Sequence, residues 1–314
     1  MKTILITGAS GFVGANLIQS LSPENRYLLL SRKERPEWNS LPGNFTLVKG
    51  ELASLDKVNF PVSDIDLIVN LAAEIKDEAL FRPTNITGVE KITRVATALG
   101  CKAIVHLSSV GVVGMQFSAG PVVVNEDAPC FPKNNYEITK LESERILKEY
   151  AAASGTHLVI LRPTNVFGEH HPRSGLLNLL QHLKNGKPVP TANGAMVNYL
   201  YVGDLADTIN WFIEHPGVSG TYNVGGGCTM DHFYSITARE LGSGFKKITV
   251  PSVLVKFLEG VNYFGLTSIG TRLRGAVNKV TYTDERLLSV KPYRFGLETG
   301  IKNTIDHYIK KGKL

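Results

Sequence analysis

The first two-thirds of the chain alternate short apolar runs with longer segments of helical period. The apolar runs, which are rich in β-branched residues, predict strands at Thr3–Thr7, Tyr27–Ser31, Thr46–Lys49, Leu67–Leu71, Ala103–Ser108 and His157–Arg162. Several of them are apolar at nearly every position, as expected for strands that are covered on both faces. The segments between them predict helices at Val13–Leu21, Asn85–Leu99 and Tyr136–Ala153. This alternation is typical of an α/β fold with a doubly wound parallel sheet.

The pattern changes after about Asn165, where loops rich in Gly, Pro and Asn are expected around His170–Gly194. An apolar stretch at Val253–Phe264 and a final helix at Glu298–Lys311 follow. The apolar stretch lacks the basic cluster of a membrane-surface helix, so we expect it to be a packed helix.

Two domains are therefore expected. Residues 1–165 would form the sheet domain, and residues 166–314 would form mainly a smaller, mixed domain over the mouth of the sheet. The chain is expected to return to the sheet near 199–224, at Tyr199–Val202 and Thr221–Val224. The boundary is therefore not a single cut.

Composition indicates an ordinary globular protein, because 43% of the 314 residues are hydrophobic and 20% are charged. The three cysteines, Cys101, Cys130 and Cys228, lack the spacing of a disulfide framework or a zinc site and fit a reducing compartment. No stretch is long enough to span a bilayer, and the first apolar run is too short for a signal peptide. We therefore expect a cytoplasmic protein with no membrane partner.

The formal net charge of +6 comes from scattered Lys and Arg residues with no aromatic-basic module. We expect no nucleic-acid partner, because an anionic cofactor or substrate explains the excess equally well. Glu169-His170-His171 is interpreted as a loop, not a metal site, since adjacent histidines project in different directions. Because the three residues follow Phe167-Gly168, they are also candidates for the edge of a substrate pocket.

A glycine-rich turn follows the first predicted strand, with the sequence Thr7-Gly8-Ala9-Ser10-Gly11-Phe12-Val13-Gly14. Glycines at this place allow a tight turn, a close approach of the backbone to a pyrophosphate, and close packing of the helix against the strand. The position of the turn between a strand and a helix predicts a dinucleotide-binding site.

The second predicted strand indicates which dinucleotide is bound. An NAD site would place an acidic residue near its end to hold the ribose 2′-hydroxyl. This strand ends instead in Ser31-Arg32-Lys33, with no acid before Glu34. Arg32 can pair with a 2′-phosphate, with Ser31 as a hydrogen-bond donor and Lys33 nearby. The sequence therefore favours NADP(H), although NAD(H) is still compatible.

Tyr136 and Lys140 are four residues apart on a predicted helix, which places the phenol and the ammonium on one face. A neighbouring ammonium favours the phenolate and so suits Tyr136 to acid–base work near neutral pH. Ser109 follows the fifth strand, and the carboxyl ends of parallel strands are where ligands bind in such sheets. The three residues together predict a site in which Ser109 orients a carbonyl that Tyr136 protonates.

The motifs occur in the order known from one protein family. The first five are Thr7-Gly8-x-x-Gly11-x-x-Gly14, Asn70-Leu71-Ala72-Ala73, Ser108-Ser109, Tyr136-x-x-x-Lys140 and Arg162-Pro163-Thr164-Asn165-Val166-Phe167-Gly168. Two later ones are Tyr201-Val202-Gly203-Asp204-Leu205-Ala206 and Tyr222-Asn223-Val224-Gly225-Gly226. Over nearly the whole chain the sequence resembles the extended short-chain dehydrogenase/reductases, also called the NAD-dependent epimerase/dehydratase family.

The resemblance implies a Rossmann-type sheet with a smaller C-terminal substrate domain, and it gives roles to matching positions. The pyrophosphate would be held by Gly8, Ser10, Gly11, Phe12 and Val13, with Gly14 completing the turn. Other parts of the cofactor would contact Glu51, Leu52, Leu71, Ala72, Ala73, Lys140 and Pro163. Asn165 would contact substrate; Asn85 matches a helix-start asparagine that is either functional or structural. Glu74 is a second candidate substrate residue, with an ordinary loop residue as the alternative. A homodimer through the helices Asn85–Leu99 and Tyr136–Ala153 is also implied.

Departures from the family pattern narrow the expected reaction. The Asp-Glu pair that follows the catalytic hydroxyl residue in 4,6-dehydratases is replaced by Val110-Gly111, so dehydration is not expected. The arginine that holds the diphosphate in many nucleotide-sugar epimerases is absent before Tyr199. The sequence favours an NADPH-dependent reductase of a 4-keto nucleotide sugar, or of a smaller ketone or aldehyde. The alternatives are an epimerase that retains NAD(H) and a non-catalytic dinucleotide sensor.

Overall fold

The computed structural model describes residues 1–33, 35, 38, 41, 43–115, 117–118, 120–171, 175–251, 253–254 and 275–314. Within these residues, seven parallel strands form a central sheet in the order β11-β7-β5-β4-β1-β2-β3. Their bounds are β1 (Thr3–Thr7), β2 (Arg26–Ser31), β3 (Asn44–Lys49), β4 (Leu67–Asn70), β5 (Ala103–Leu107), β7 (His157–Pro163) and β11 (Gly220–Val224). The predicted doubly wound sheet is confirmed, and each of the six strands predicted from apolar runs is present.

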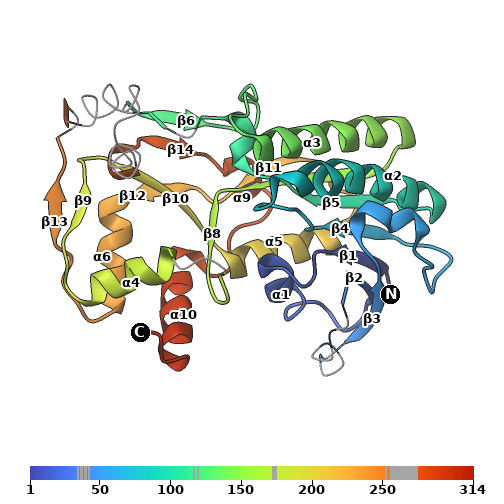
Figure 1. Ribbon diagram of the computed structural model, residues 1–314, viewed down its shortest axis with the longest axis horizontal. Helices are drawn as coiled ribbons and strands as arrows, with labels where there is room; N and C mark the ends of the chain where they lie inside the picture. Colours follow the sequence, from blue (N-terminus) through green and yellow to red (C-terminus); the bar gives the residue numbers. More distant parts are fainter. Residues whose placement is uncertain are drawn as a thin grey trace.

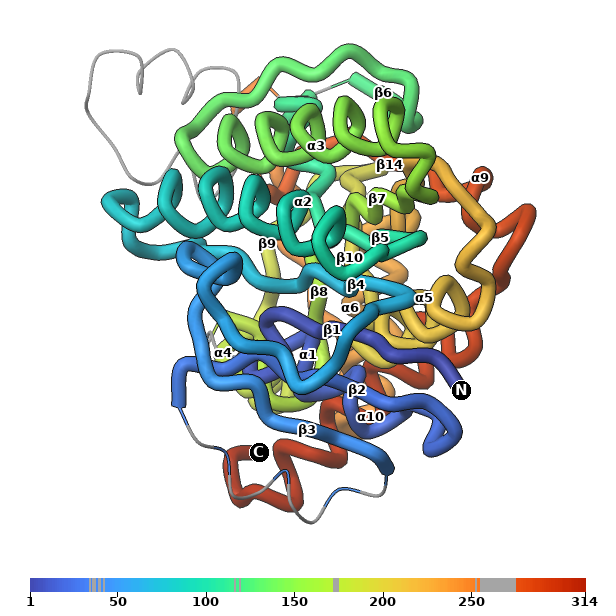
Figure 2. Tube along the Cα trace, turned by 90° about the vertical axis from the view of Figure 1, so that its right-hand side faces the viewer, coloured from blue at the N-terminus to red at the C-terminus, as the bar shows by residue number. Residues whose placement is uncertain are grey.

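Each face of the sheet has its own core, because successive side chains of a strand point to opposite faces. Ile4 and Ile6 pack on the face covered by α1 (Phe12–Leu17) and α5 (Val202–Glu214). Leu5 packs on the other face, whose core also takes side chains from α2 (Gly88–Ala98) and α3 (Asn135–Ser154). Figures 1 and 2 show α2 and α3 side by side on that face. The apolar runs of the inner strands therefore become strands covered on both sides, whereas β3 at the edge of the sheet is largely exposed.

Two of the predicted helices differ from expectation at their ends. α1 stops at Leu17 rather than Leu21, because the N–H and the hydroxyl of Ser20 both bond to the Leu17 carbonyl and close the helix. The helix predicted at Asn85–Leu99 begins as a π-helical segment, η4 (Arg82–Thr87), before it continues as α2.

Apart from α5 and β11, most of the described chain beyond β7 forms a mixed region at the carboxyl edge of the sheet (Figure 1). β10 (Met196–Tyr201) pairs with β8 (Asn165–Phe167) and β12 (Gly227–Thr229), and β9 (Val189–Thr191) pairs with β13 (Lys247–Thr249). α4 (Gly175–Lys184), α6 (Met230–Glu240) and α10 (Gly296–Lys310) pack around an apolar core of their own. Elsewhere in the described chain, short helical elements precede β7 at η2 (Leu52–Lys57), η3 (Glu78–Leu80) and η5 (Val110–Val113), and α9 (Glu285–Leu288) follows it. None of the helices in the described ranges has the length and apolar character to cross a membrane.

Three expectations for this region need correction or fall outside the structure. Tyr199–Val202 does not return to the central sheet, because its strand residues belong to β10 and Val202 begins α5. His170–Gly194 is not only loop, since leucines at helical spacing form α4, with Leu180 and Leu183 buried. Of the apolar stretch Val253–Phe264, only the first two residues are described, so the packed helix expected there lies outside the described residues.

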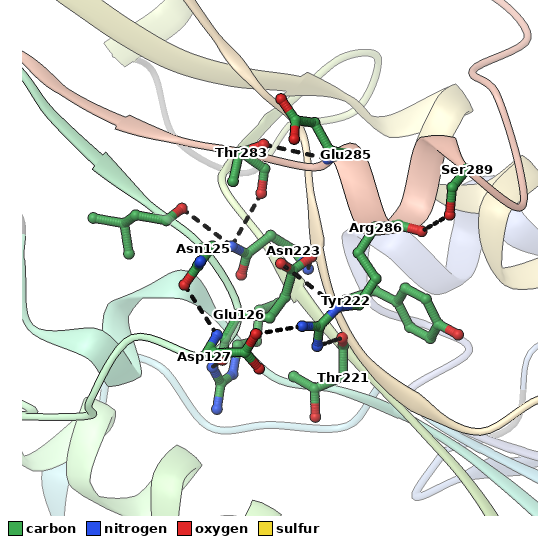
Figure 3. Close-up of polar contacts among 12 residues, drawn as sticks. Asn125, Glu126, Asp127, Thr221, Tyr222, Asn223, Thr283, Glu285, Arg286 and Ser289 are labelled. Atoms are coloured by element: carbon green, nitrogen blue, oxygen red, sulfur yellow. Dashed lines mark hydrogen bonds and ion pairs between the residues drawn. The ribbon is translucent and has the colours of Figure 1, made fainter.

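The return to the central sheet is made by β11, which lies beside β7 at its edge. A polar network ties β11 to a small parallel pair, β6 (Val122–Val124) and β14 (Val280–Tyr282), as Figure 3 shows. The Asn223 N–H donates to the Glu126 carboxylate at 3.0 Å, and the Asn223 amide donates to the Thr283 carbonyl at 3.1 Å. Arg286 pairs with Asp127 at 2.6 Å. These bonds attach the late part of the chain to the strand that precedes Gly225.

Candidate active site

Two cavities lie where the central strands end, on either side of the glycine turn. The larger cavity has a volume of about 930 Å³ and the smaller one about 310 Å³. Gly8, Gly11, Leu71 and Ala73 line both, so the turn and the end of β4 form the boundary between them. This is the arrangement that a dinucleotide requires, with its pyrophosphate over the turn and one half of the molecule on each side.

The glycines of the turn are required by close backbone contacts. Gly8 has a φ of +72°, and a side-chain Cβ there would lie 2.6 Å from the backbone nitrogen of Ala72. A Cβ at Gly14 would lie 2.4 Å from the Gly8 carbonyl oxygen. Gly11 precedes α1 without a side chain that caps it. The backbone of the turn is therefore open to a phosphate group and fits the predicted cofactor.

The smaller cavity collects residues that follow β2, β3 and β4. Eight of the residues predicted to bind the cofactor line it: Ser10, Ser31, Arg32, Glu51, Leu52, Leu71, Ala72 and Ala73. Ser31 is buried, and its hydroxyl donates to the Lys33 carbonyl at 2.8 Å, so it stabilises the turn after β2. Lys33 does not line the cavity. Arg32 is exposed, and in the described part of the chain no hydrogen bond or ion pair holds it.

Glu74, a candidate substrate residue with an ordinary loop residue as the alternative, lines the smaller cavity together with Arg32 and not the larger cavity. The reason is the main chain after β4, which Asn85 holds through two hydrogen bonds, from the Glu74 N–H at 2.8 Å and to the Glu74 carbonyl at 3.1 Å. Asn85 is buried and also bonds to Thr139 of α3, which gives it a structural role.

The start of α3 is fixed by reciprocal capping. The Asn134 side chain accepts from the Glu137 N–H at 3.0 Å, and the Glu137 carboxylate accepts from the Lys133 N–H at 2.7 Å. Tyr136 lies in this first turn, and its ring meets the edge of Phe81 with the centroids 6.1 Å apart. The helix start thus holds Tyr136 at the wall of the larger cavity.

Ser109, Tyr136 and Lys140 all line the larger cavity. Lys140 is 2% exposed, and its ammonium donates to the Leu107 carbonyl at 2.5 Å. Burial lowers the pKa of Lys140 to about 8, although the negative charge of Glu144 opposes the shift. The Ser109 hydroxyl oxygen accepts from the Gly111 N–H at 3.1 Å, which leaves its proton for a ligand in the cavity.

The remaining wall of the larger cavity combines apolar and aromatic side chains with polar ones such as Glu137 and Thr164. Pro163 and Asn165, predicted beside the nicotinamide and the substrate, are both part of it. Four further lining residues were not predicted from the sequence: Phe167, Leu176, Leu179 and Tyr199. His171 also lines the cavity and belongs to the segment proposed from the sequence as an edge of the substrate pocket. His171 meets Phe12 edge-on at 5.0 Å between centroids. Helical spacing of the α4 leucines is the one signal that could have identified part of this wall.

A buried polar chain beneath the site also went unpredicted. The Thr7 hydroxyl donates to Asn70 at 2.6 Å, and the Asn70 amide reaches Nδ1 of His106 at 2.9 Å. Nε2 of His106 then lies 3.3 Å from the hydroxyl of Ser143 on α3. Since the amide nitrogen of Asn70 can only donate, Nδ1 of His106 accepts and the ring carries its proton on Nε2. Burial, with the charge of Lys140, holds the pKa of His106 well below its usual value, so the ring stays neutral under the ammonium.

Comparisons with known proteins agree with this architecture. A model of the NAD-dependent epimerase/dehydratase family matches residues 4–225. UDP-glucose 4-epimerase of Vibrio cholerae is 28% identical over 327 residues, which cover 98% of this chain and 96% of that protein. A trifunctional UDP-glucose 4,6-dehydratase, 3,5-epimerase and UDP-4-keto-L-rhamnose-reductase of Arabidopsis thaliana is 29% identical over 246 residues, but the match spans 71% of this chain and only 37% of that protein.

Solved structures show the same fold at low sequence identity. UDP-N-acetylglucosamine 4-epimerase of Bacillus cereus superposes with a TM-score of 0.72 at 17% identity, covering 99% of this chain and 97% of that one. UDP-glucose 4-epimerase of Thermus thermophilus, in complex with NAD, gives a TM-score of 0.70 at 21% identity, covering 98% and 99%. These likenesses extend through the mixed region as well as the sheet.

Proposed function

The chain belongs to the NAD-dependent epimerase/dehydratase family, and we propose that it is an NADP(H)-dependent reductase of a carbonyl compound. The observation that carries the proposal is Arg32, which stands exposed and unpaired among the described residues on the wall of the smaller cavity. A guanidinium there suits a 2′-phosphate, and exchangeable NADPH suits net reduction. A 4-keto nucleotide sugar is the first candidate substrate, and a smaller ketone or aldehyde is the second.

In the proposed mechanism, Gly8, Gly11 and Arg32 would hold NADPH, which would supply the hydride for the carbonyl carbon. Tyr136 donates its phenolic proton to the carbonyl oxygen, so the carbonyl becomes an alcohol and the phenol becomes a phenolate. Ser109 donates a hydrogen bond to the same oxygen and holds it toward Tyr136. The Lys140 ammonium stabilises the phenolate that forms and reaches the ribose of the cofactor.

The lowered pKa of Lys140 predicts an alkaline limit to turnover. The ammonium is the charged form, so its stabilisation of the phenolate is present below about pH 8 and is lost as the pH rises through that value. We expect kcat/KM for carbonyl reduction to fall above about pH 8 with a slope of about one decade per pH unit. Lys140→Met should lower the plateau about 10²-fold and remove this limb. An unchanged limb in the variant would assign the titration to another group.

An epimerase is the second candidate, favoured by the match to the Vibrio cholerae epimerase over nearly the whole of both chains. Such an enzyme would oxidise and re-reduce a sugar carbon with NAD(H) that never leaves. The test is what happens to the dinucleotide. Net oxidation of NADPH by a carbonyl compound supports the reductase. Interconversion of two nucleotide sugars by protein that retains NAD(H) through purification, with no net consumption, supports the epimerase.

The proposed enzyme acts in the cytoplasm as a homodimer joined through α2 and α3. Ile138 on the outer face of α3 is 43% exposed, beside a cavity of about 540 Å³ that Leu141 and Arg145 also line. Burial of such a surface against a second copy would stabilise a dimer. Light scattering that gives the mass of a single chain in solution would contradict this arrangement.

A further inference from the structure

The smaller cavity contains two opposite charges that no bond joins. Arg32 follows β2 and Glu74 follows β4, and β1 separates these two strands in the sheet. The side chains therefore enter the cavity from either side of the glycine turn. No ion pair between them is present among the described residues, so each charge is available to a ligand in the cavity.

Glu74 is held in place by its own backbone surroundings. One oxygen of its carboxylate, Oε1, accepts from the N–H groups of Ile75 at 2.9 Å, Lys76 at 2.8 Å and Asp77 at 3.2 Å. The second oxygen, Oε2, has no hydrogen-bond partner within the described residues. The two hydrogen bonds from the Asn85 side chain hold the main chain of Glu74, and Asn85 itself bonds to Thr139 of α3. The carboxylate is thus oriented before any ligand binds.

The same contacts keep this carboxylate ionised. Partial burial raises the pKa of Glu74, but the three backbone N–H groups and the charge of Arg32 outweigh it, so the pKa lies below its usual value. A ligand in the smaller cavity therefore meets a fixed negative charge from β4 as well as a positive charge from β2.

We infer that Glu74 and Arg32 set the cofactor preference in opposite directions, Glu74 towards NAD(H) and Arg32 towards NADP(H). The Glu74 carboxylate follows β4 and supplies the acid that is missing at the end of β2. This inference rests on the proposed binding of NADP(H). The free oxygen of Glu74 accepts from an adenosine ribose hydroxyl of NAD(H) and repels the 2′-phosphate of NADP(H). Arg32 attracts that phosphate. The site consequently binds both dinucleotides with a ratio of affinities that the two charges set together.

Binding measurements on single variants test this assignment without any substrate. Glu74→Gln removes the charge but keeps an oxygen that can accept from the three N–H groups, so the loop is preserved. Titration calorimetry should show the ratio of NAD⁺ to NADP⁺ dissociation constants rising about tenfold, with NADP⁺ bound more tightly and NAD⁺ more weakly. Arg32→Ala should move the ratio about tenfold in the other direction.

Two controls separate a charge effect from a structural one. Glu78→Gln removes a carboxylate from the same segment that does not line the cavity, and it should leave the ratio unchanged. Glu74→Asn, a shorter uncharged side chain, should move the ratio in the same direction as Glu74→Gln. The gain in NADP⁺ affinity should also shrink as salt is raised, because part of it is Coulombic.

The results bear separately on the inference and on the proposed function. A ratio unchanged by both Glu74 variants, or equal weakening of both dinucleotides, would overturn the role of Glu74. Tighter binding of NAD⁺ than of NADP⁺ by the unmodified protein would contradict the proposed NADP(H) preference. In that case a shift of the ratio in Glu74→Gln would still support the inference.

Discussion

Replacement of Tyr136 with Phe is expected to lower kcat for carbonyl reduction about 10³-fold. The variant loses the only proton that the proposed mechanism delivers to the carbonyl oxygen. It keeps the ring that packs against Phe81, so the start of α3 should be undisturbed. The dissociation constant for NADPH should change by less than about twofold, since the phenol acts on the reacting carbonyl and contributes little to cofactor binding.

A matched control comes from the same helix. Tyr150→Phe removes a hydroxyl that contacts Thr97 at 3.3 Å, far along α3 from the larger cavity, and it should leave kcat within about twofold. Steady-state rates and fluorescence titration of NADPH measure both quantities. Turnover by Tyr136→Phe that matches the control would exclude Tyr136 as the proton donor.

Replacement of Arg162 with Met is expected to cost about 3–5 kcal/mol of the free energy of unfolding. Arg162 and Glu144 form a bidentate ion pair, with Nε to Oε1 at 2.9 Å and Nη2 to Oε2 at 2.6 Å. Their side chains are 3% and 1% exposed. Burial raises the pKa of Glu144, but the pairing with Arg162 and the Ser108 hydroxyl bring it below its usual value. Without Arg162, the carboxylate would be buried with only weaker partners.

An exposed ion pair on α10 provides the comparison. Lys302 lies 2.5 Å from Asp306, and both side chains are more than half exposed, so Lys302→Met should cost less than about 1 kcal/mol. Urea unfolding followed by circular dichroism measures both variants. A cost for Arg162→Met no larger than that for Lys302→Met would mean that the buried ion pair does not stabilise the fold.

The sheet could be predicted because its strands are continuous apolar runs and must be covered on both faces. The same reasoning placed Tyr136, Lys140 and Ser109 at one edge of the sheet, since the carboxyl ends of parallel strands form the edge where ligands bind in such a fold. The glycine turn was equally predictable, because close backbone contacts at Gly8 and Gly14 admit no side chain.

Other features depend on contacts between distant parts of the chain. Asn70 and His106 are isolated polar residues in apolar strands, and only the assembled sheet shows that they join in one chain of hydrogen bonds. Glu74 was expected near substrate, but its position depends on Asn85, 11 residues later. The strand pattern around Tyr199 correctly predicted a strand, but it contains no information on which sheet that strand joins, and Tyr199 pairs with β8 outside the central sheet.

Net consumption of NADPH by the purified protein would distinguish a reductase from an epimerase. The assay would present keto-sugar nucleotides, simple ketones and aldehydes in parallel, with NADH beside NADPH for each compound. We predict net oxidation of NADPH with one class of carbonyl compound, faster than with NADH and lost in Tyr136→Phe. No net consumption with any class, together with NAD(H) that stays bound and interconversion of nucleotide sugars, would contradict the reductase and favour the epimerase.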